Sequence, residues 1–174
     1  MPTYLQQRIQ QVKNSPVANT LASLQCGIEK EGLRVGLSGR VSHKNHPQAL
    51  GSSLTHSSIT TDYSEALLEY ITPVFQSPVA ALNFMQELHS FSASKLQDLG
   101  EYVWPASMPC YLDGEDDIRI ADFGSSNTGK LKHTYRLGLA WRYGKIMQSI
   151  AGLHFNFSPQ DNFWPAYQQL LSDE

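Results

Sequence analysis

Alternating polar and apolar side chains predict three β-strands along the chain. Residues 25–37 and 152–158 alternate, and residues 65–74 form a mostly apolar, strand-like run. A period of two is typical of a strand that turns one face toward a core. A shorter strand is predicted at residues 118–123, immediately before a polar loop.

The segments between these strands have a different pattern. Apolar residues recur at helical spacing in residues 78–99, and residues 4–13 and 131–147 also read as helices. Residues 38–58 and 104–109 contain the turn-forming residues of loops. Strands and helices that follow one another without strict βαβ repetition predict an α+β fold.

Composition places the chain among ordinary globular proteins. Its 174 residues are 41% hydrophobic and 17% charged, which is enough for one hydrophobic core. A net charge of −3 gives no reason to expect nucleic acid as a partner, and the longest apolar runs are too short to span a membrane. The polar N-terminus lacks the apolar stretch of a signal peptide, and Cys26 and Cys110 lie far apart. We therefore expect a cytoplasmic protein without disulfide bonds.

Two carboxylates lie two residues apart in the first predicted strand. In the segment GIEKEGLRV, the side chains of Glu29 and Glu31 would project from the same face. Such a pair repels itself unless a cation lies between the two carboxylates. The alternative is a solvent-facing strand with two ordinary acids, and this segment alone does not decide between them.

The other two strands add further polar groups. Asp62, Glu65 and Glu69 are acids in or beside the apolar second strand, where burial of a carboxylate is costly unless it is paired or binds a metal. The polar face of the third strand, GLHFNFS, contributes His154, although an isolated strand histidine is more often just hydrogen-bonded in place. Three strands with such groups on one face predict a divalent-cation site. Carboxylates with one imidazole favour Mg²⁺ or Mn²⁺ over zinc.

A competing motif is the segment from Gly124 to Lys130. Its sequence, GSSNTGK, fits the first seven positions of a phosphate-binding P-loop, between a possible strand and a helix. The eighth position of that motif is a Ser or Thr that holds Mg²⁺, and here it is Leu131. The alternatives are a polar turn with a solvated Lys130 and a loop that faces a substrate.

Five segments between about Gly27 and Phe163 together carry a resemblance to a known family. Their sequences are GIEKEGLRV, LTHSSITTDYSEALLEYITPV, WPASMPCYL, GSSNTGKLKHTYRLGLAWRYG and MQSIAGLHFNFS. In their order and spacing these segments resemble successive blocks of the proteobacterial glutamate–cysteine ligases. The chain resembles the N-terminal part of these enzymes and is far shorter than their full length.

The resemblance implies a fold and a set of site residues. The family belongs to the glutamine-synthetase-like ligases, in which antiparallel strands with flanking helices line a metal-binding funnel and ATP is bound without a P-loop. The implied site has two Mg²⁺ (or Mn²⁺) ions, one held by Glu29 and His154 and the other by Glu31, Asp62 and Glu69. A pocket for the cysteine side chain is implied at Tyr63, Tyr135 and Leu139. Substrate-proximal positions are implied at Ser126, Asn127, Thr128 and Arg136.

The resemblance also implies a reaction. ATP phosphorylates the γ-carboxylate of L-glutamate, and the amine of L-cysteine then displaces phosphate to give γ-glutamylcysteine, the first step of glutathione biosynthesis. Residues 1–174 would form the N-terminal portion of one catalytic domain, with the C-terminal part of the enzyme missing, so activity of this chain alone is not expected. The alternatives are a non-catalytic module that binds a metal or a partner, and a P-loop nucleotidase that depends on Lys130.

Overall fold

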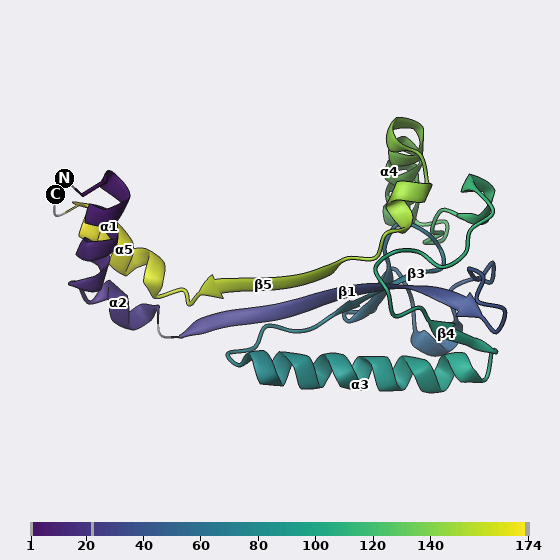
Figure 1. Ribbon diagram of the computed structural model, residues 1–174, viewed down its shortest axis with the longest axis horizontal. Helices are drawn as coiled ribbons and strands as arrows, with labels where there is room; N and C mark the ends of the chain where they lie inside the picture. Colours follow the sequence, from purple (N-terminus) through teal and green to yellow (C-terminus); the bar gives the residue numbers. More distant parts are fainter. Residues whose placement is uncertain (1, 22, 173–174) are drawn as a thin grey trace.

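A long strand, β1, is the centre of the computed structural model, which describes residues 2–21 and 23–172 (Figure 1). β1 pairs with β3 along one edge and with β4 and β5 along the other, and β2 extends the sheet beyond β3. Every ladder is antiparallel. The strands are β1 (Leu24–Gly36), β2 (Ile59–Thr61), β3 (Leu67–Ile71), β4 (Glu101–Val103) and β5 (Leu153–Pro159).

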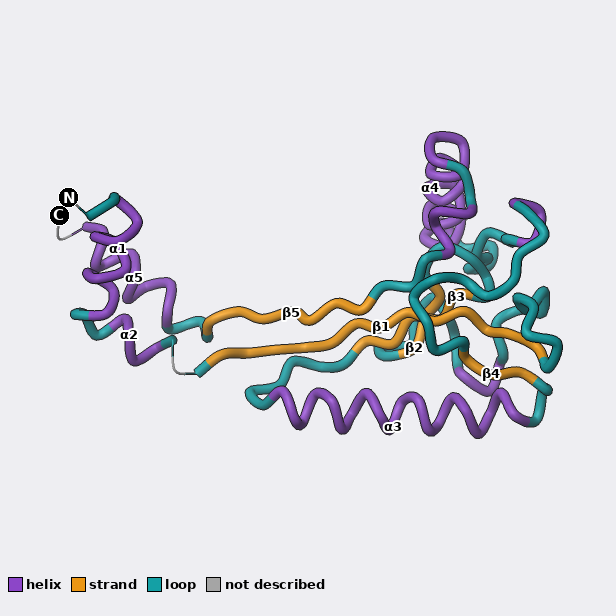
Figure 2. The backbone as a smooth tube through the Cα atoms, viewed as in Figure 1, coloured by secondary structure: helices purple, strands orange, loops and turns teal. Residues whose placement is uncertain are grey.

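The helices lie on both faces and at one end of this sheet (Figure 2). The α-helices are α1 (Tyr4–Lys13), α2 (Val17–Thr20), α3 (Pro78–Gln97), α4 (Asn127–Tyr143) and α5 (Phe163–Ser172). Three short 3₁₀ helices occur in the loops, namely η1 (Gln48–Leu50), η2 (Glu115–Asp117) and η3 (Ile146–Ser149). None of the helices in the described residues is both long and apolar enough to cross a membrane.

Helix α3 covers one face of the sheet. Met85 and Leu96 of α3 pack against Leu68 and Tyr70 of β3 in a buried apolar cluster. Ser77 caps the helix by accepting a hydrogen bond from the backbone of Ala80, and Pro78 follows at the first helical position, where its missing N–H is not needed. Burial of this apolar face fixes which side chains of β1 and β3 turn to the opposite face.

The opposite face has a second apolar cluster near one end of the sheet, below α4. Leu33 and Val35 of β1 join Tyr63 and Leu67 in this cluster, and Leu139 of α4 packs against it. The remainder of this face, along β1 and β5, is not covered by a helix (Figure 1). It is the part of the sheet that contains the predicted acids.

The far ends of β1 and β5 lead into a separate helical lobe. Helices α1, α2 and α5 lie together there, at a distance from α3 and α4 (Figure 2). Thr3 and Gln6 form a capping box at the start of α1, which explains why a polar segment is helical. The helix predicted at residues 4–13 is confirmed.

One of the predicted elements is wrong, a second is displaced along the chain and a third is too long. Residues 118–123 form no strand, because the segment makes only an isolated bridge between Ile120 and Ser64. The helix predicted from residue 131 begins at Asn127, so the polar loop before it is shorter than predicted. The strand predicted at residues 65–74 is limited to β3, and Glu65 lies in the turn that precedes it.

Candidate active site: a carboxylate-rich sheet face beside helix α4

The strand register brings four predicted metal ligands to one face of the sheet. Glu31 lies opposite Glu69 in the β1–β3 ladder, and Glu29 lies opposite His154 in the β1–β5 ladder. Directly opposite residues of an antiparallel pair project to the same face. Asp62 follows the end of β2, whose Thr60 is opposite Glu69. We call Glu29, Glu31, Asp62, Glu69 and His154 together the acid face.

Two contacts hold side chains of the acid face in place. Nδ1 of His154 lies 3.4 Å from Oε2 of Glu29. Oε2 of Glu31 accepts a hydrogen bond of 2.7 Å from the backbone N–H of Gly152. A Cβ atom at Gly152 would lie 2.9 Å from Nε2 of His154 and 3.4 Å from Oε2 of Glu31. Gly152 therefore leaves the space that these two side chains occupy.

The acids of this face repel one another. Partial burial, and then the charges of Asp62, Glu31 and Glu29, raise the pKa of Glu69 to about 7, while Arg136 acts in the opposite direction. Burial also raises the pKa of Glu31, an effect that the hydrogen bond from Gly152 partly offsets. A proton on Glu69 relieves this repulsion, and a bound cation would do the same.

Arg136 connects α4 to the acid face. Its Nε donates a hydrogen bond to the backbone carbonyl of Asp62, and its Nη1 donates to the carbonyl of Lys132 at 3.1 Å. The guanidinium also lies over the ring of Phe123, 4.7 Å from its centroid. Burial lowers the pKa of Arg136, although the neighbouring carboxylates of Asp62 and Glu69 favour its charged form. This substrate-proximal candidate thus lies beside the acids.

The three predicted cysteine-pocket residues lie in different surroundings. Tyr63 is buried in the cluster against which Leu139 packs, so these two are brought together. Among the described residues, the buried hydroxyl of Tyr63 has no hydrogen-bond partner. Tyr135 is on the exposed side of α4, one residue from Arg136. An unpartnered buried hydroxyl is costly, so this position suits a polar ligand atom.

Ser126, Asn127 and Thr128 lie at the beginning of α4. Ser126 is the N-cap, and its hydroxyl accepts a hydrogen bond of 3.1 Å from the backbone of Gly129. Asn127 and Thr128 form the exposed first turn. The capping role accounts for the serine, and the site described above does not include these three residues.

The structure also accounts for the P-loop-like sequence. The segment before Gly124 is not a strand, and Lys130 is exposed on the first turn of α4. A Cβ atom at Gly129 would lie 2.5 Å from the carbonyl oxygen of Phe123 and 2.8 Å from that of Gly124. The second glycine of the motif is therefore explained by close packing of the helix against its own preceding loop.

The donor set of the acid face fits an oxygen-binding cation in kind. It has four carboxylates and one imidazole, and burial together with the neighbouring carboxylates raises the pKa of Glu69. In residues 2–21 and 23–172, no three His, Cys, Asp or Glu side chains already converge at the distances needed to hold a metal ion. Binding would therefore require these side chains to change rotamer.

A cavity of about 260 Å³ adjoins the acid face along β1 and β5. Gln25 is opposite Ser158, and Gly27 is opposite Asn156, so their positions continue the face of Glu29. All five residues line the cavity. The lining of this cavity is mostly apolar, and Gln25, Asn156 and Ser158 add amide and hydroxyl groups to it.

The sequence alone did not identify Gly152 or the role of Glu65. Gly152 lies next to the third strand, and only the fold shows which side chains it makes room for. The carboxylate of Glu65 is bound by backbone N–H groups of distant segments, which a sequence pattern cannot show. The acidic charge of Glu65 within an apolar run was the available signal.

Comparison with known proteins decides the family. The model of the family described as glutamate-cysteine ligase matches residues 9–174. The chain belongs to this family. The predicted resemblance to the glutamate–cysteine ligases is thereby confirmed.

Curated relatives with the name glutamate–cysteine ligase are similar over most of this chain. The ligase of Hahella chejuensis is 59% identical over 152 residues, which cover 87% of this chain and 29% of the relative. The ligase of Alcanivorax borkumensis is 48% identical over 170 residues, which cover 98% of this chain and 32% of the relative. The chain thus spans about a third or less of the length of these ligases.

Two solved structures share the fold of this chain. A glutamate–cysteine ligase from Francisella tularensis in complex with AMP matches with a TM-score of 0.81 and 41% identity, over 86% of this chain and 30% of that one. A bifunctional glutathione synthetase from Pasteurella multocida matches with a TM-score of 0.77 and 27% identity, over 95% of this chain and 20% of that one. The predicted α+β fold, an antiparallel sheet with flanking helices, is confirmed as the ligase fold.

Proposed function

We propose that this chain takes part in the ATP-dependent ligation of L-glutamate, through its γ-carboxylate, to L-cysteine. The observation that carries this proposal is the acid face in a chain of the glutamate–cysteine ligase family. Glu29 and His154 would hold one Mg²⁺ or Mn²⁺ ion, and Glu31, Asp62 and Glu69 would hold another. A bound cation would neutralise the phosphates of ATP and the charge that develops on the transferred phosphoryl group.

The cavity beside Glu29 supports a place for the nucleotide. It continues the acid face along β1 and β5, so a nucleotide in it would direct its phosphates toward Glu29 and His154. The related ligase from Francisella tularensis was crystallised with AMP, which supports nucleotide binding in this family. Asn156 and Ser158 would hydrogen-bond to the nucleotide from the floor of this cavity.

The residues of α4 would position the amino-acid acceptor. Tyr63 and Leu139 lie together in a buried cluster below the helix, and the unpartnered hydroxyl of Tyr63 would hydrogen-bond to a polar atom of a substrate that enters there. Tyr135 and Arg136 would close this pocket from the helix. Recognition of the thiol in such a pocket holds the cysteine amine near the γ-glutamyl phosphate, so that catalysis depends mainly on proximity.

The competing assignments differ in what the structure offers them. A P-loop nucleotidase loses its supporting geometry, because Lys130 is solvent-exposed and the strand that should precede the loop is not formed. A non-catalytic module would retain cation binding without cysteine-dependent turnover. A cytoplasmic location, and the assignment of residues 1–174 to a portion of one larger catalytic domain, stay predictions.

Manganese binding tests the acid face without requiring turnover. We expect the free Mn²⁺ signal in electron paramagnetic resonance to fall on titration with the chain, and Glu29→Ala to remove the part of this effect that belongs to the ion held by Glu29 and His154. Gly152→Ala would push the side chains of His154 and Glu31 from their places and weaken binding about tenfold. Gly36→Ala is the matched control in β1, because a Cβ atom there meets no atom within 4 Å.

Phosphate release with ATP, Mg²⁺, glutamate and cysteine then separates a ligase from a binding module. Release that requires both amino acids, is lost in Glu29→Ala and persists in Lys130→Ala would establish ligation by this chain. Manganese binding that is unchanged by both Glu29→Ala and Gly152→Ala would contradict the proposed acid face.

A further inference from the structure

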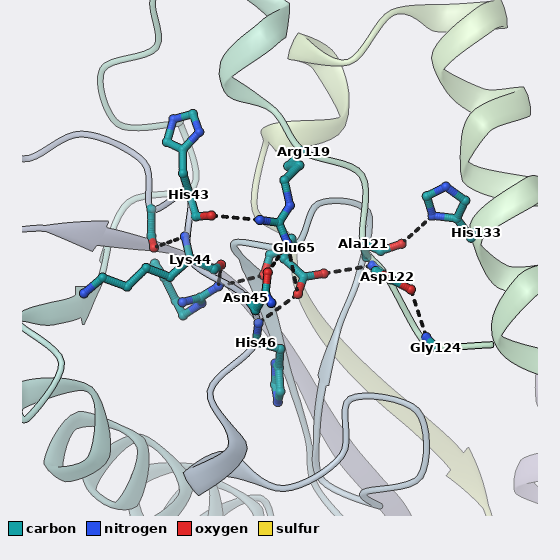
Figure 3. A network of polar contacts seen from close by, with 12 residues as sticks. His43, Lys44, Asn45, His46, Glu65, Arg119, Ala121, Asp122, Gly124 and His133 are labelled. Carbon is teal, nitrogen blue, oxygen red and sulfur yellow. Dashed lines mark hydrogen bonds and ion pairs between the residues drawn. The ribbon is translucent and has the colours of Figure 1, made fainter. Parts of the chain in front are cut away.

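Glu65 is a buried carboxylate outside the acid face, and both of its oxygens are engaged (Figure 3). Oε1 accepts a hydrogen bond of 2.8 Å from the backbone N–H of His46, and Oε2 accepts one of 2.8 Å from the N–H of Asp122. The guanidinium of Arg119 lies 3.6 Å from Oε1. We call Glu65 and these three partners the Glu65 clasp.

The clasp joins three segments that are far apart in sequence. Arg119 also donates to the carbonyl of His43 at 2.8 Å and to Oδ1 of Asn45 at 2.6 Å. The backbone N–H of Glu65 donates to the carbonyl of Arg119 at 2.8 Å. The loop before η1, the turn between β2 and β3, and the loop before α4 are therefore fastened at one point.

The loops meet beside a cavity, although Ile118 of the loop before α4 belongs to the buried apolar cluster of Leu33 and Tyr63. A cavity of about 310 Å³ lies against the clasp and is lined by His46, Glu65, Arg119 and Asp122, among others. Close-packed side chains would keep the loops in place even if a polar contact were lost. Beside a cavity, the loss of a carboxylate oxygen leaves a backbone N–H without its partner.

A continuous series of contacts leads from the clasp to α4 (Figure 3). The residue before Asp122, Ala121, donates its N–H to the carbonyl of Tyr63 at 3.1 Å. The carbonyl of Ala121 lies 2.8 Å from Nδ1 of His133, on the second turn of α4. Asp122 also accepts a hydrogen bond of 2.9 Å from the N–H of Gly124, which stiffens the loop that enters the helix.

The turn that contains Glu65 also reaches α4 a second time. Arg136 of α4 donates to the carbonyl of Asp62, three residues before Glu65. The helix is thus attached to the β2–β3 turn at two points, through His133 and through Arg136. Both attachments lie on the part of α4 that leads to Tyr135 and Leu139.

We propose that Glu65 is a positioning residue that holds α4 at a fixed distance from Asp62, and so sets the acceptor pocket relative to the acid face. Glu65 itself contacts neither surface. The functional part of this inference rests on the proposed ligase function, whereas the coupling of Glu65 to α4 does not.

Glu65→Gln is the informative substitution. Glutamine keeps the size of the side chain, but its NH₂ group cannot accept a hydrogen bond from a backbone N–H. Glu101→Gln is the matched control, since both glutamates are 4% exposed. Glu101 pairs with Arg34 at 2.8 Å and with the hydroxyl of Ser42. It reaches the turn of Glu65 only through Arg34, whose Nη2 donates to the backbone carbonyl of Glu65 at 3.0 Å, and it leaves both carboxylate contacts of Glu65 in place. Any general loss of stability should affect both variants.

Spin labels attached to cysteines that replace Glu87 of α3 and Leu131 of α4 test the proposed coupling. Pulsed electron–electron double resonance measures the distribution of distances between the two labels. Both positions are exposed, and the native Cys26 and Cys110 are buried, so a count of two spins per chain verifies the labelling. We expect a single narrow distance distribution in the parent and in Glu101→Gln. Glu65→Gln should give a distribution about twofold broader.

His133→Ala provides a second variant in case Glu65→Gln does not fold. It removes the contact with Ala121 at a half-buried position and should also broaden the distribution. A parent-like width in Glu65→Gln or, where that variant does not fold, in His133→Ala would overturn the proposal. Equal broadening in Glu101→Gln would overturn it as well.

Turnover provides the functional readout. If the chain ligates, Glu65→Gln should raise the KM for cysteine severalfold and leave the KM for ATP nearly unchanged. Glu101→Gln should change neither KM value. Equal changes in both KM values would reduce Glu65 to a purely structural role. Absence of turnover in the parent would count against the proposed function, and the spin-label distances would still decide whether Glu65 positions α4.

Discussion

Glu69 shows how the surroundings of one residue change its chemistry. It lies opposite Glu31 in the sheet, near Asp62 and Glu29, and its pKa is raised to about 7. In the unfolded chain its pKa returns to about 4.5. Between these two pH values the folded chain binds a proton that the unfolded chain has released, so this group lowers stability progressively as the pH rises from about 4.5 to about 7.

Replacement of Glu69 by Gln should therefore stabilise the metal-free chain at high pH. We expect the free energy of unfolding of Glu69→Gln, relative to the parent, to rise by about 1–2 kcal/mol between pH 5 and pH 8, after allowance for solvent screening of a half-buried group. Urea unfolding in the presence of EDTA measures this difference. The exposed Glu87→Gln is the control, and a difference that is independent of pH would contradict the prediction.

At this scale, the sequence predicted the shared face correctly but not its geometry. The alternation along the first strand placed Glu29 and Glu31 together because side-chain direction is a local property. The pairing of Glu31 with Glu69 depends on register between strands, which the sequence pattern does not contain. The sequence pattern also grouped Glu65 with Glu69, because it does not show that β3 begins only at Leu67, after the turn that contains Glu65.

Helix α4 is the element that brings Arg136 to the sheet, and its two glycines have opposite surroundings. A Cβ atom added at Gly129 would lie closer than van der Waals distance to the carbonyl oxygens of Phe123 and Gly124. A Cβ atom added at Gly138 would meet no atom within 4 Å. The sequence predicted the helix but began it late, because Ser126 acts as an N-cap within what resembled a phosphate loop. The strand predicted at residues 118–123 fails because its backbone groups bind a turn and the Glu65 clasp instead of a neighbouring strand.

The two glycines give a prediction within a single helix. Gly129→Ala should lower the free energy of unfolding by about 1–3 kcal/mol, because the new methyl group must displace backbone rather than a flexible side chain. Gly138→Ala should raise it by about 0.5–1 kcal/mol, because alanine loses less conformational entropy in a helix. Chemical unfolding of both variants checks the signs. Equal effects would mean that α4 is not packed against residues 123–124.

The whole molecule leaves an apolar surface along β5. Leu153, Phe155 and Phe157 are well exposed on the face of β5 opposite His154, and within the described residues β5 pairs only with β1. A strand with an open edge and an apolar face tends to pair with another chain. The comparison with relatives agrees with this exposure, because their sequences extend well beyond the part matched here.

A charge on this surface should therefore reduce self-association. We expect Phe155→Lys to raise the dissociation constant of self-association about tenfold or more, since burial of a phenylalanine contributes about 1.5–3 kcal/mol. Sedimentation velocity over a range of concentrations measures the change. Trp141→Lys is the control, because Trp141 is an exposed aromatic residue on α4, a different element from β5. A larger effect of the control would place the self-associating surface on α4.

The helical lobe at the end of β1 and β5 has a consequence for synthesis on the ribosome. Helix α2 contacts α5, and β1 pairs with β5, so early segments of the chain have their partners among late ones. Closing so long a loop is slow relative to local folding, and β3 and α3 can associate with β1 well before β5 has left the exit tunnel. The helices translated first should therefore be among the last segments to become protected from proteolysis. The first part of β1 keeps one edge unpaired until β5 has been synthesised.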